Sequence, residues 1–124
     1  MPTIIRNGIT YGGGGGTGNA SNKYSTEEQV IGTWIDGRRI YRRVISKQLF
    51  ALGFTDITSE GIYDQIIRQQ GYFEANNEKY PLPRMYSGSS IEMSISSSNN
   101  IRVENRYNAS YPITAIIEYT KTTD

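Results

Sequence analysis

The chain has 124 residues, with 13 Lys and Arg against 12 Asp and Glu, so its formal net charge is +1. This length predicts one domain, and the near balance of charges argues against nucleic-acid binding by bulk charge. The sequence contains no Cys and no His, which excludes disulfides, thiolate nucleophiles and the commonest metal ligand and general base. It has no apolar run of transmembrane length and no recognisable signal peptide, so we expect folding in a cytoplasm without membrane insertion.

Residues 1–23 are predicted to be a glycine-rich N-terminal arm. A phosphate-binding loop would need Gly-Lys-Ser/Thr at the start of a helix, and no such sequence follows the glycine run at residues 12–16. The composition is instead typical of a linker. The candidates for anchoring the arm to a partner are the apolar residues before the glycines: Ile4, Ile5, Ile9 and Tyr11.

Residues 25–28, Ser-Thr-Glu-Glu, fit two interpretations, the start of a short helix or a polar lead-in to a hairpin. The hairpin is predicted by Asp36-Gly37 between two apolar runs, because a two-residue type I′ turn needs positive φ at both central residues. We expect its first strand at about residues 29–35. Residues 38–49 carry apolar side chains at helical spacing, whereas the turn and the β-branched residues favour a strand.

Four arginines in this stretch can be interpreted as a patch for an anionic ligand or an acidic partner surface. They are Arg38, Arg39, Arg42 and Arg43. Charges on strands more often prevent aggregation or form surface ion pairs, which is the interpretation we favour.

The segment at residues 62–73 has isoleucines at helical spacing, so its local pattern alone indicates a helix. The aromatic pair Tyr72 and Phe73 within it fits a sugar platform, or core or intersubunit packing. Asn76-Asn77 and the prolines at residues 81–83 predict a loop, because Pro is disfavoured inside central strands.

From residue 90 onward the β pattern is clear. Apolar residues alternate with polar ones on both sides of the Ser/Asn-rich residues 96–100, so residues 90–105 predict a hairpin. Residues 113–119 are the last expected strand. At least five short strands separated by turns predict an all-β domain at residues 24–124, an antiparallel β-sandwich or a jelly roll.

Three segments carry a resemblance to a known family. YSTEEQVIGTWIDGRRIY at residues 24–41 resembles the opening of the C-terminal domain of phage tail-fibre, tail-spike and head-fibre proteins. EYTKTTD at residues 118–124 and IIRNGITYGGGG at residues 4–15 resemble the end and the start of such proteins. The resemblance implies strands at residues 38–49 and 62–73, and we predict strands there.

The resemblance also implies a function. The chain is then expected to be a non-enzymatic virion protein without cofactor or metal, a homotrimeric head fibre or decoration protein on the capsid surface. Its arm would bind a capsid or other virion protein, and its head domain would adhere to host-surface glycans. The short chain favours a head fibre over a short tail-fibre or baseplate receptor-binding protein, and a carbohydrate-binding module is a further alternative. Candidates for trimer or core packing are Trp34, Tyr72 and Phe73.

An enzymatic alternative rests on pairs of carboxyl groups. A glycosidase needs two of them about 5 Å or roughly 6.5–9.5 Å apart, and Glu60 can be paired with Asp56 or with Asp64. With 12 acidic residues such pairs arise by chance, and serine nucleophiles have no His partner. We therefore predict that the chain is not an enzyme.

Overall fold

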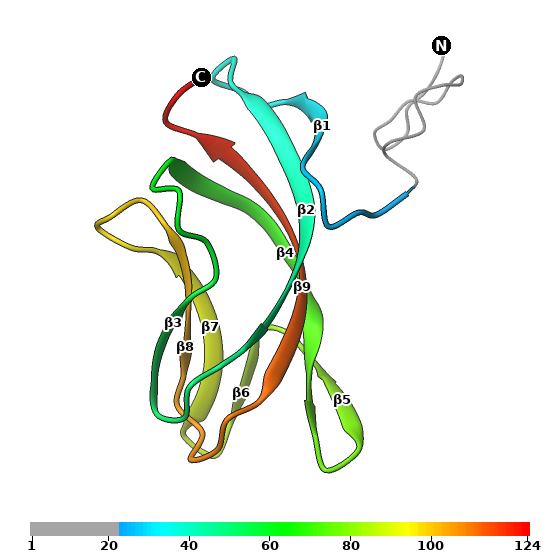
Figure 1. Cartoon of the computed structure of the whole chain (residues 1–124), viewed down its shortest axis with the longest axis vertical. Helices are drawn as coiled ribbons and strands as arrows, with labels where there is room; N and C mark the ends of the chain where they lie inside the picture. Colours follow the sequence, from blue (N-terminus) through cyan, green and yellow to red (C-terminus); the bar gives the residue numbers. More distant parts are fainter. Residues whose placement is uncertain (1–22) are drawn as a thin grey trace.

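The computed structural model describes residues 23–124, which form nine β-strands and no helix (Figure 1). The strands are β1 (Gln29–Thr33), β2 (Arg39–Gln48), β3 (Gly53–Asp56), β4 (Tyr63–Ala75), β5 (Glu78–Pro81), β6 (Arg84–Tyr86), β7 (Ser89–Ile95), β8 (Ile101–Asn105) and β9 (Pro112–Lys121). The all-β prediction is confirmed. The anchoring candidates Ile4, Ile5, Ile9 and Tyr11 lie outside the described residues.

The strands form two antiparallel sheets packed face to face. The five-stranded sheet has the order β1-β2-β9-β4-β5 and the four-stranded sheet the order β3-β8-β7-β6. Figure 1 shows the four-stranded sheet beside the lower part of the five-stranded sheet, so the β1–β2 hairpin extends beyond it. This arrangement is consistent with the predicted β-sandwich.

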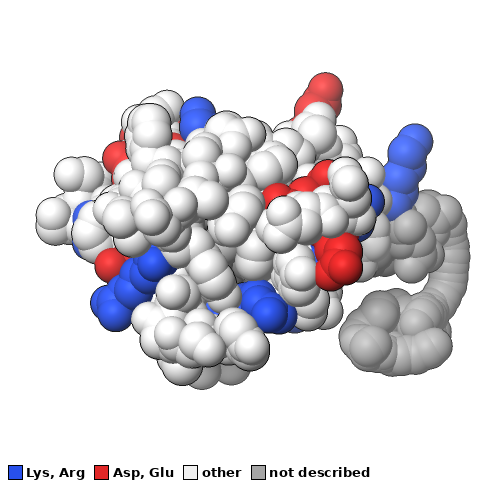
Figure 2. Space-filling model, turned by 90° about the horizontal axis from the view of Figure 1, so that it is seen from below, with Lys and Arg blue, Asp and Glu red and all other residues white. Residues whose placement is uncertain are grey.

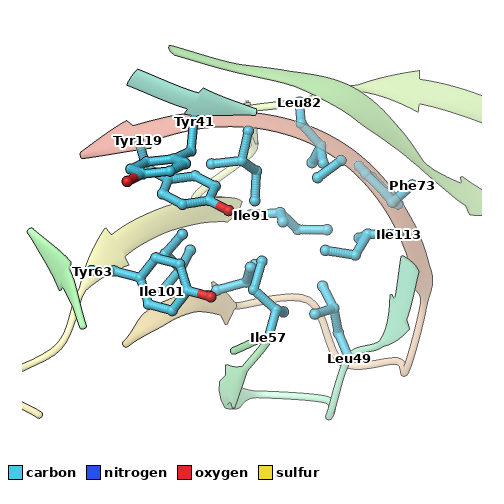
Figure 3. Packing of buried hydrophobic residues seen from close by; sticks show 13 residues of the cluster. Tyr41, Leu49, Ile57, Tyr63, Phe73, Leu82, Ile91, Ile101, Ile113 and Tyr119 are labelled. Atoms are coloured by element: carbon cyan, nitrogen blue, oxygen red, sulfur yellow. The ribbon is translucent and has the colours of Figure 1, made fainter. Parts of the chain in front are cut away.

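The core lies between the two sheets and follows the alternation of their strands (Figure 3). Every second residue of β9 faces inward and is at most 2% exposed: Ile113, Ala115, Ile117 and Tyr119. Ile101 and Val103 of β8 face them from the other sheet and are fully buried. Burying each such aliphatic side chain contributes about 1.5–3 kcal/mol, and this burial holds the two sheets together.

One end of the core is a cluster of three tyrosines. The Tyr119 ring stacks on Tyr41 at a centroid distance of 5.9 Å and meets the edge of Tyr63 at 4.9 Å. Figure 3 shows the three rings converging from separate strands. The cluster therefore joins β2, β4 and β9 within the five-stranded sheet.

The hydroxyl groups of two of these tyrosines donate hydrogen bonds to carboxylates. The Tyr119 hydroxyl donates to Glu28 at 2.6 Å, and the Tyr63 hydroxyl donates to Glu60 at 2.9 Å. Glu28 also pairs with the Lys121 ammonium at 2.7 Å. Burial first, and then these hydrogen bonds, raise the pKa of Tyr119 and of Tyr63 above the ordinary tyrosine range.

The segment before β1 is the polar lead-in, not a helix. The Ser25 hydroxyl accepts a hydrogen bond from the Glu27 amide at 3.0 Å. The Ser25 carbonyl accepts one from the Val44 amide at 2.8 Å, which places this segment along β2. The two interpretations of residues 25–28 are thus resolved by pairing with β2.

The β1–β2 hairpin is confirmed, but its predicted two-residue turn is wrong. The Trp34 carbonyl accepts a hydrogen bond from the Gly37 amide at 2.9 Å, and the Trp34 amide donates to the Arg38 carbonyl at 2.7 Å. Gly37 has φ of +90°, whereas Asp36 has no positive φ. The connection is a three-residue loop, a type I turn followed by a glycine bulge.

The loop predicted at residues 76–83 is instead a second hairpin. Asn76 and Asn77 have φ of +54° and +65°, and they close β4 onto β5 as a type I′ turn. Pro81 is tolerated because β5 is an edge strand, so its missing N–H interrupts no ladder. The strands predicted at residues 38–49 and 62–73 are confirmed as β2 and β4.

The described residues contain no helix long and apolar enough to cross a membrane.

Gly71 is expected to be essential for the contact between β4 and β9. A Cβ atom there would lie 2.1 Å from the Thr114 carbonyl oxygen and 2.8 Å from the Ala115 Cα, at a φ of +137°. We expect Gly71→Ala to lower the free energy of unfolding by about 3 kcal/mol or more, measured by urea denaturation. Gly32→Ala, where nothing lies within 4 Å, is the control and should change it by less than about 1 kcal/mol. Equal midpoints for the two variants would contradict the observed approach of the strands.

The tyrosine cluster predicts a loss of stability at alkaline pH. Tyrosines of the unfolded chain ionise near pH 10, whereas the folded Tyr119 keeps its proton to higher pH because its pKa is raised. Stability is therefore intact below about pH 10 and falls above it, since only the unfolded state releases the proton. We expect Tyr119→Phe to cost about 1.5–3 kcal/mol at pH 7 and to make the decline above pH 10 shallower.

Urea denaturation at pH 7, 9, 10 and 11 measures both effects. Glu28→Gln is the control, because it removes the carboxylate but leaves Tyr119 buried. Since burial is the larger cause of the raised pKa, this variant should keep most of the alkaline slope. An unchanged slope in Tyr119→Phe would show that Tyr119 is not responsible.

Candidate functional site

Glu60, the carboxyl group that both proposed pairs share, does not have the electrostatics of a general acid. The hydrogen bond from Tyr63 is the main cause that lowers the pKa of Glu60, whereas a general acid needs a raised pKa. Asp64 accepts a hydrogen bond from the Arg38 guanidinium, and Asp56 is exposed at the end of β3. Within residues 23–124 no group of three or more acidic side chains is placed to hold a metal ion.

The four arginines do not form one patch, because adjacent residues of a strand face opposite sides. Arg42 lies opposite Glu118 on the outer face of the five-stranded sheet, whereas Arg43 lies opposite the buried Ile117. Arg42 is only 4% exposed, and its guanidinium lies 4.3 Å from the centre of the Tyr24 ring. These contacts fit structural roles better than the binding of an anionic ligand.

The aromatic pair Tyr72 and Phe73 is divided between two faces for the same reason. Phe73 is 2% exposed in the core and packs against Tyr80 at 5.3 Å and Tyr111 at 5.2 Å. Tyr72 points to the outer face, with the Lys79 ammonium 5.7 Å from its ring centre. The two rings therefore cannot form one sugar platform. Trp34 is half-buried just after β1.

Sequence reasoning missed a group of exposed apolar side chains close together in the chain. Phe50, Leu52 and Phe54, at the start of β3 and in the connection before it, are 68%, 64% and 50% exposed. We call these three residues the β3 surface. The only sequence signal is the apolar run Phe-Ala-Leu-Gly-Phe at residues 50–54, which on its own predicts a core strand.

The backbone of the β3 surface is fixed by a fully buried asparagine. The Asn105 amide donates to the Phe50 carbonyl at 3.0 Å and to the Ala109 carbonyl at 2.8 Å. The Asn105 side-chain carbonyl accepts a hydrogen bond from the Tyr107 amide at 2.9 Å. A buried polar group with all its partners is rigid, so Asn105 holds the β2–β3 and β8–β9 connections together.

The backbone contacts of Leu52 fix the exposed position of its side chain. Its amide donates to the Tyr107 carbonyl at 3.1 Å, and its φ is +49°. The left-handed region is unfavourable for a bulky residue and persists only where surrounding contacts enforce it. The loop therefore presents Leu52 to solvent in a defined orientation.

A second apolar surface lies on β6. Met85 and Tyr86 are 76% and 63% exposed. As adjacent residues of an edge strand they project from opposite sides of it, and we call the two together the β6 surface. The Arg84 guanidinium lies 4.4 Å from the ring centre of Tyr80 and 5.5 Å from that of Tyr86. Arg84 thereby links the β6 surface to the aromatic residues of the core.

Both surfaces lie towards the same end of the molecule. Figure 1 places the β2–β3 and β6–β7 connections at its lower end, and Figure 2 views the molecule from that side. Uncharged residues dominate that view, and charged side chains are scattered singly among them. This end of the sandwich therefore carries the β3 and β6 surfaces among few charged side chains.

A pocket of about 280 Å³ opens beside the β6 surface. It is lined by Gln69, Pro83, Arg84, Met85, Glu92 and Met93. The buried Gln69 Oε1 has no hydrogen-bond partner among the described residues, so it can accept a hydrogen bond from the hydroxyl of a bound ligand. Donor and acceptor side chains on apolar walls suit a small polar ligand with several hydroxyls.

Comparisons of the chain with protein-family models, with curated proteins and with solved structures give no match.

Proposed function

We propose that the chain is a non-enzymatic structural protein of a phage virion, a homotrimeric head fibre or decoration protein on the capsid surface. The observation that supports this proposal is the rigid display of five large apolar side chains at one end of a small sandwich. These side chains form two separate surfaces, on β3 and on β6, and exposed apolar surfaces of this kind are typical of protein contacts. The resemblance of residues 24–41 and 118–124 to phage fibre proteins supplies the virion context.

In this proposal the sandwich and the arm have different roles. The sandwich is the projecting head, and its apolar end contacts other copies of the chain. Residues 1–23 attach the trimer to the capsid through Ile4, Ile5, Ile9 and Tyr11. A domain of about 100 residues buries a limited share of its surface, so association adds stability that the isolated head lacks.

The arm is expected to be necessary for attachment to the virion. We expect the full chain, added to particles from a phage lacking its gene, to co-sediment with them. A chain that begins at Tyr24 should stay in the supernatant, because it keeps the head but loses the arm. Sedimentation followed by quantitative immunoblotting measures the bound fraction.

Circular dichroism of the shortened chain provides the control, since a folded head that fails to bind isolates the role of the arm. Gold-labelled antibodies in electron micrographs then separate a capsid location from a tail or baseplate location. Absence of the chain from purified particles would refute the proposed function.

A carbohydrate-binding head is the second candidate, and the pocket beside the β6 surface favours it. We expect Gln69→Leu to weaken binding to any glycan that the wild-type head retains on an array by at least about tenfold, because it removes the buried acceptor. Glu74→Gln, at an exposed position outside the pocket, is the control and should bind as the wild type does. Equal binding by both variants would exclude this pocket as the glycan site.

A further inference from the structure

The β3 and β6 surfaces occupy the two opposite edges of one sheet. The order β3-β8-β7-β6 leaves each edge strand with a single neighbour among the described strands. Three inter-strand spacings of about 4.8 Å place the edges about 14 Å apart. Exposed strand edges are usually shielded by charge or by a covering segment, and here each edge carries exposed apolar side chains.

The two surfaces also lie at the same height along the strands. One row of paired residues crosses the whole sheet: Gly53 of β3, Asn105 of β8, Ile91 of β7 and Arg84 of β6. Leu52 directly precedes Gly53 on β3, and Met85 directly follows Arg84 on β6. Because β3 and β6 run in opposite directions, Leu52 and Met85 are displaced from the row towards the same end of the sheet.

This arrangement has a consequence for symmetry. A two-fold dimer uses one patch that contacts itself, whereas a ring uses two different patches in head-to-tail contact. A ring closes only when the rotation from one copy to the next completes a full circle without displacement along its axis, and otherwise the contact gives a filament. Leu52 and Met85 have matching heights, so a rotation about an axis along the strands brings one surface onto the other.

The two surfaces are chemically suited to each other. Phe50 and Phe54 offer aromatic rings, and Met85 and Tyr86 offer a flexible thioether and a ring that pack well against them. The charges beside the β3 surface have both signs, since Arg102 lies opposite Asp56 and its guanidinium is 4.0 Å from the ring centre of Phe54. Arg84 on β6 forms no ion pair within residues 23–124.

The exposed apolar area of the two surfaces is about half of what a small stable interface buries. At about 200 Å² for each large side chain, the exposed fractions of the five residues amount to roughly 600 Å². Small stable interfaces bury about 1,200 Å² in total. The apolar side chains therefore supply about half of such an interface, and the backbone and polar groups of β3 and β6 are available for the rest.

We propose that the β3 surface of one copy packs on the β6 surface of the next copy, and that three such head-to-tail contacts close a trimer. This inference rests on the trimer of the proposed function and identifies the surfaces that hold it together. Phe50, Leu52 and Phe54 form one half of each contact, and Met85 and Tyr86 form the other half.

Complementation between two variants of the full chain tests this geometry. Phe50→Ser with Leu52→Asn removes the β3 surface, and asparagine suits the left-handed backbone at residue 52. Met85→Lys removes the β6 surface, because a lysine on an edge strand opposes pairing. Each variant should be a monomer by light scattering, while the wild-type chain has three times the monomer mass.

An equimolar mixture of the two variants should give a heterodimer with twice the monomer mass. One intact β3 surface and one intact β6 surface remain in the mixture, so one contact forms but the ring cannot close. A contact of one patch with itself predicts no rescue on mixing. Monomers in the mixture would therefore overturn the head-to-tail arrangement.

Ile35→Ser is the matched control, because Ile35 is 92% exposed in the hairpin loop after β1, outside both surfaces. It should remain a trimer. Trimers in both surface variants would refute the assigned surfaces and leave the proposed trimer intact, whereas a monomeric wild-type chain would refute both. If either variant fails to fold by circular dichroism, Phe54→Thr and Tyr86→Thr replace them with the same expectations.

Discussion

The insertion of β9 between β2 and β4 is the constraint on which the rest of the structure depends. The β1–β2 and β4–β5 hairpins form from nearby residues, but they become one sheet only when β9 pairs with both. The pairing of Tyr41 with Tyr119 spans most of the described chain. Such distant contacts require the closure of long loops before they contribute stability, so the tyrosine cluster and the buried face of β9 together secure a pairing that local turns cannot.

The strands with one buried face were predictable from their own residue pattern, whereas β2 and β4, which carry apolar residues on both faces, were predicted as strands only with the help of the family resemblance. Residues 91–95, 101–105 and 113–119 alternate because one face meets the core and the other faces solvent. In β2, Val44 lies on the outer face opposite Ile116, next to the inward-facing Ile45, and such adjacent apolar pairs imitate helical spacing. In β4, register shifts between Tyr63 and Gln65 and between Ile66 and Arg68 interrupt the alternation. Only pairing partners distant in sequence resolve these two segments as strands.

The β3 surface was missed because its alternation is the reverse of what hydrophobicity predicts. Thr55 is 4% exposed and its neighbour Phe54 is 50% exposed, so the polar side chain faces inward. A shift by one residue would exchange the two faces. Two hydrogen bonds oppose that shift, from the Phe50 amide to the Thr55 hydroxyl and from Asn105 to the Phe50 carbonyl. The fold thus leaves Phe50 68% exposed and places the Arg102 guanidinium, 4.0 Å from the ring centre, over the half-exposed Phe54. The exposure that remains at this edge fits the use outside the monomer that we propose.

In the proposed function, association between copies and attachment through the arm involve different sheets. The apolar surfaces belong to the four-stranded sheet, whereas Tyr24 packs on Arg42, on the outer face of the five-stranded sheet. The arm that precedes Tyr24 therefore starts from a face that the head-to-tail contact does not use, so association and attachment do not compete for the same residues. Three arms on one ring would bind as a linked set, and linkage raises the overall affinity by about 10²–10⁴ without any new contact. A short apolar segment that binds weakly in a single copy is then sufficient to hold a trimer on a surface that repeats its own binding site.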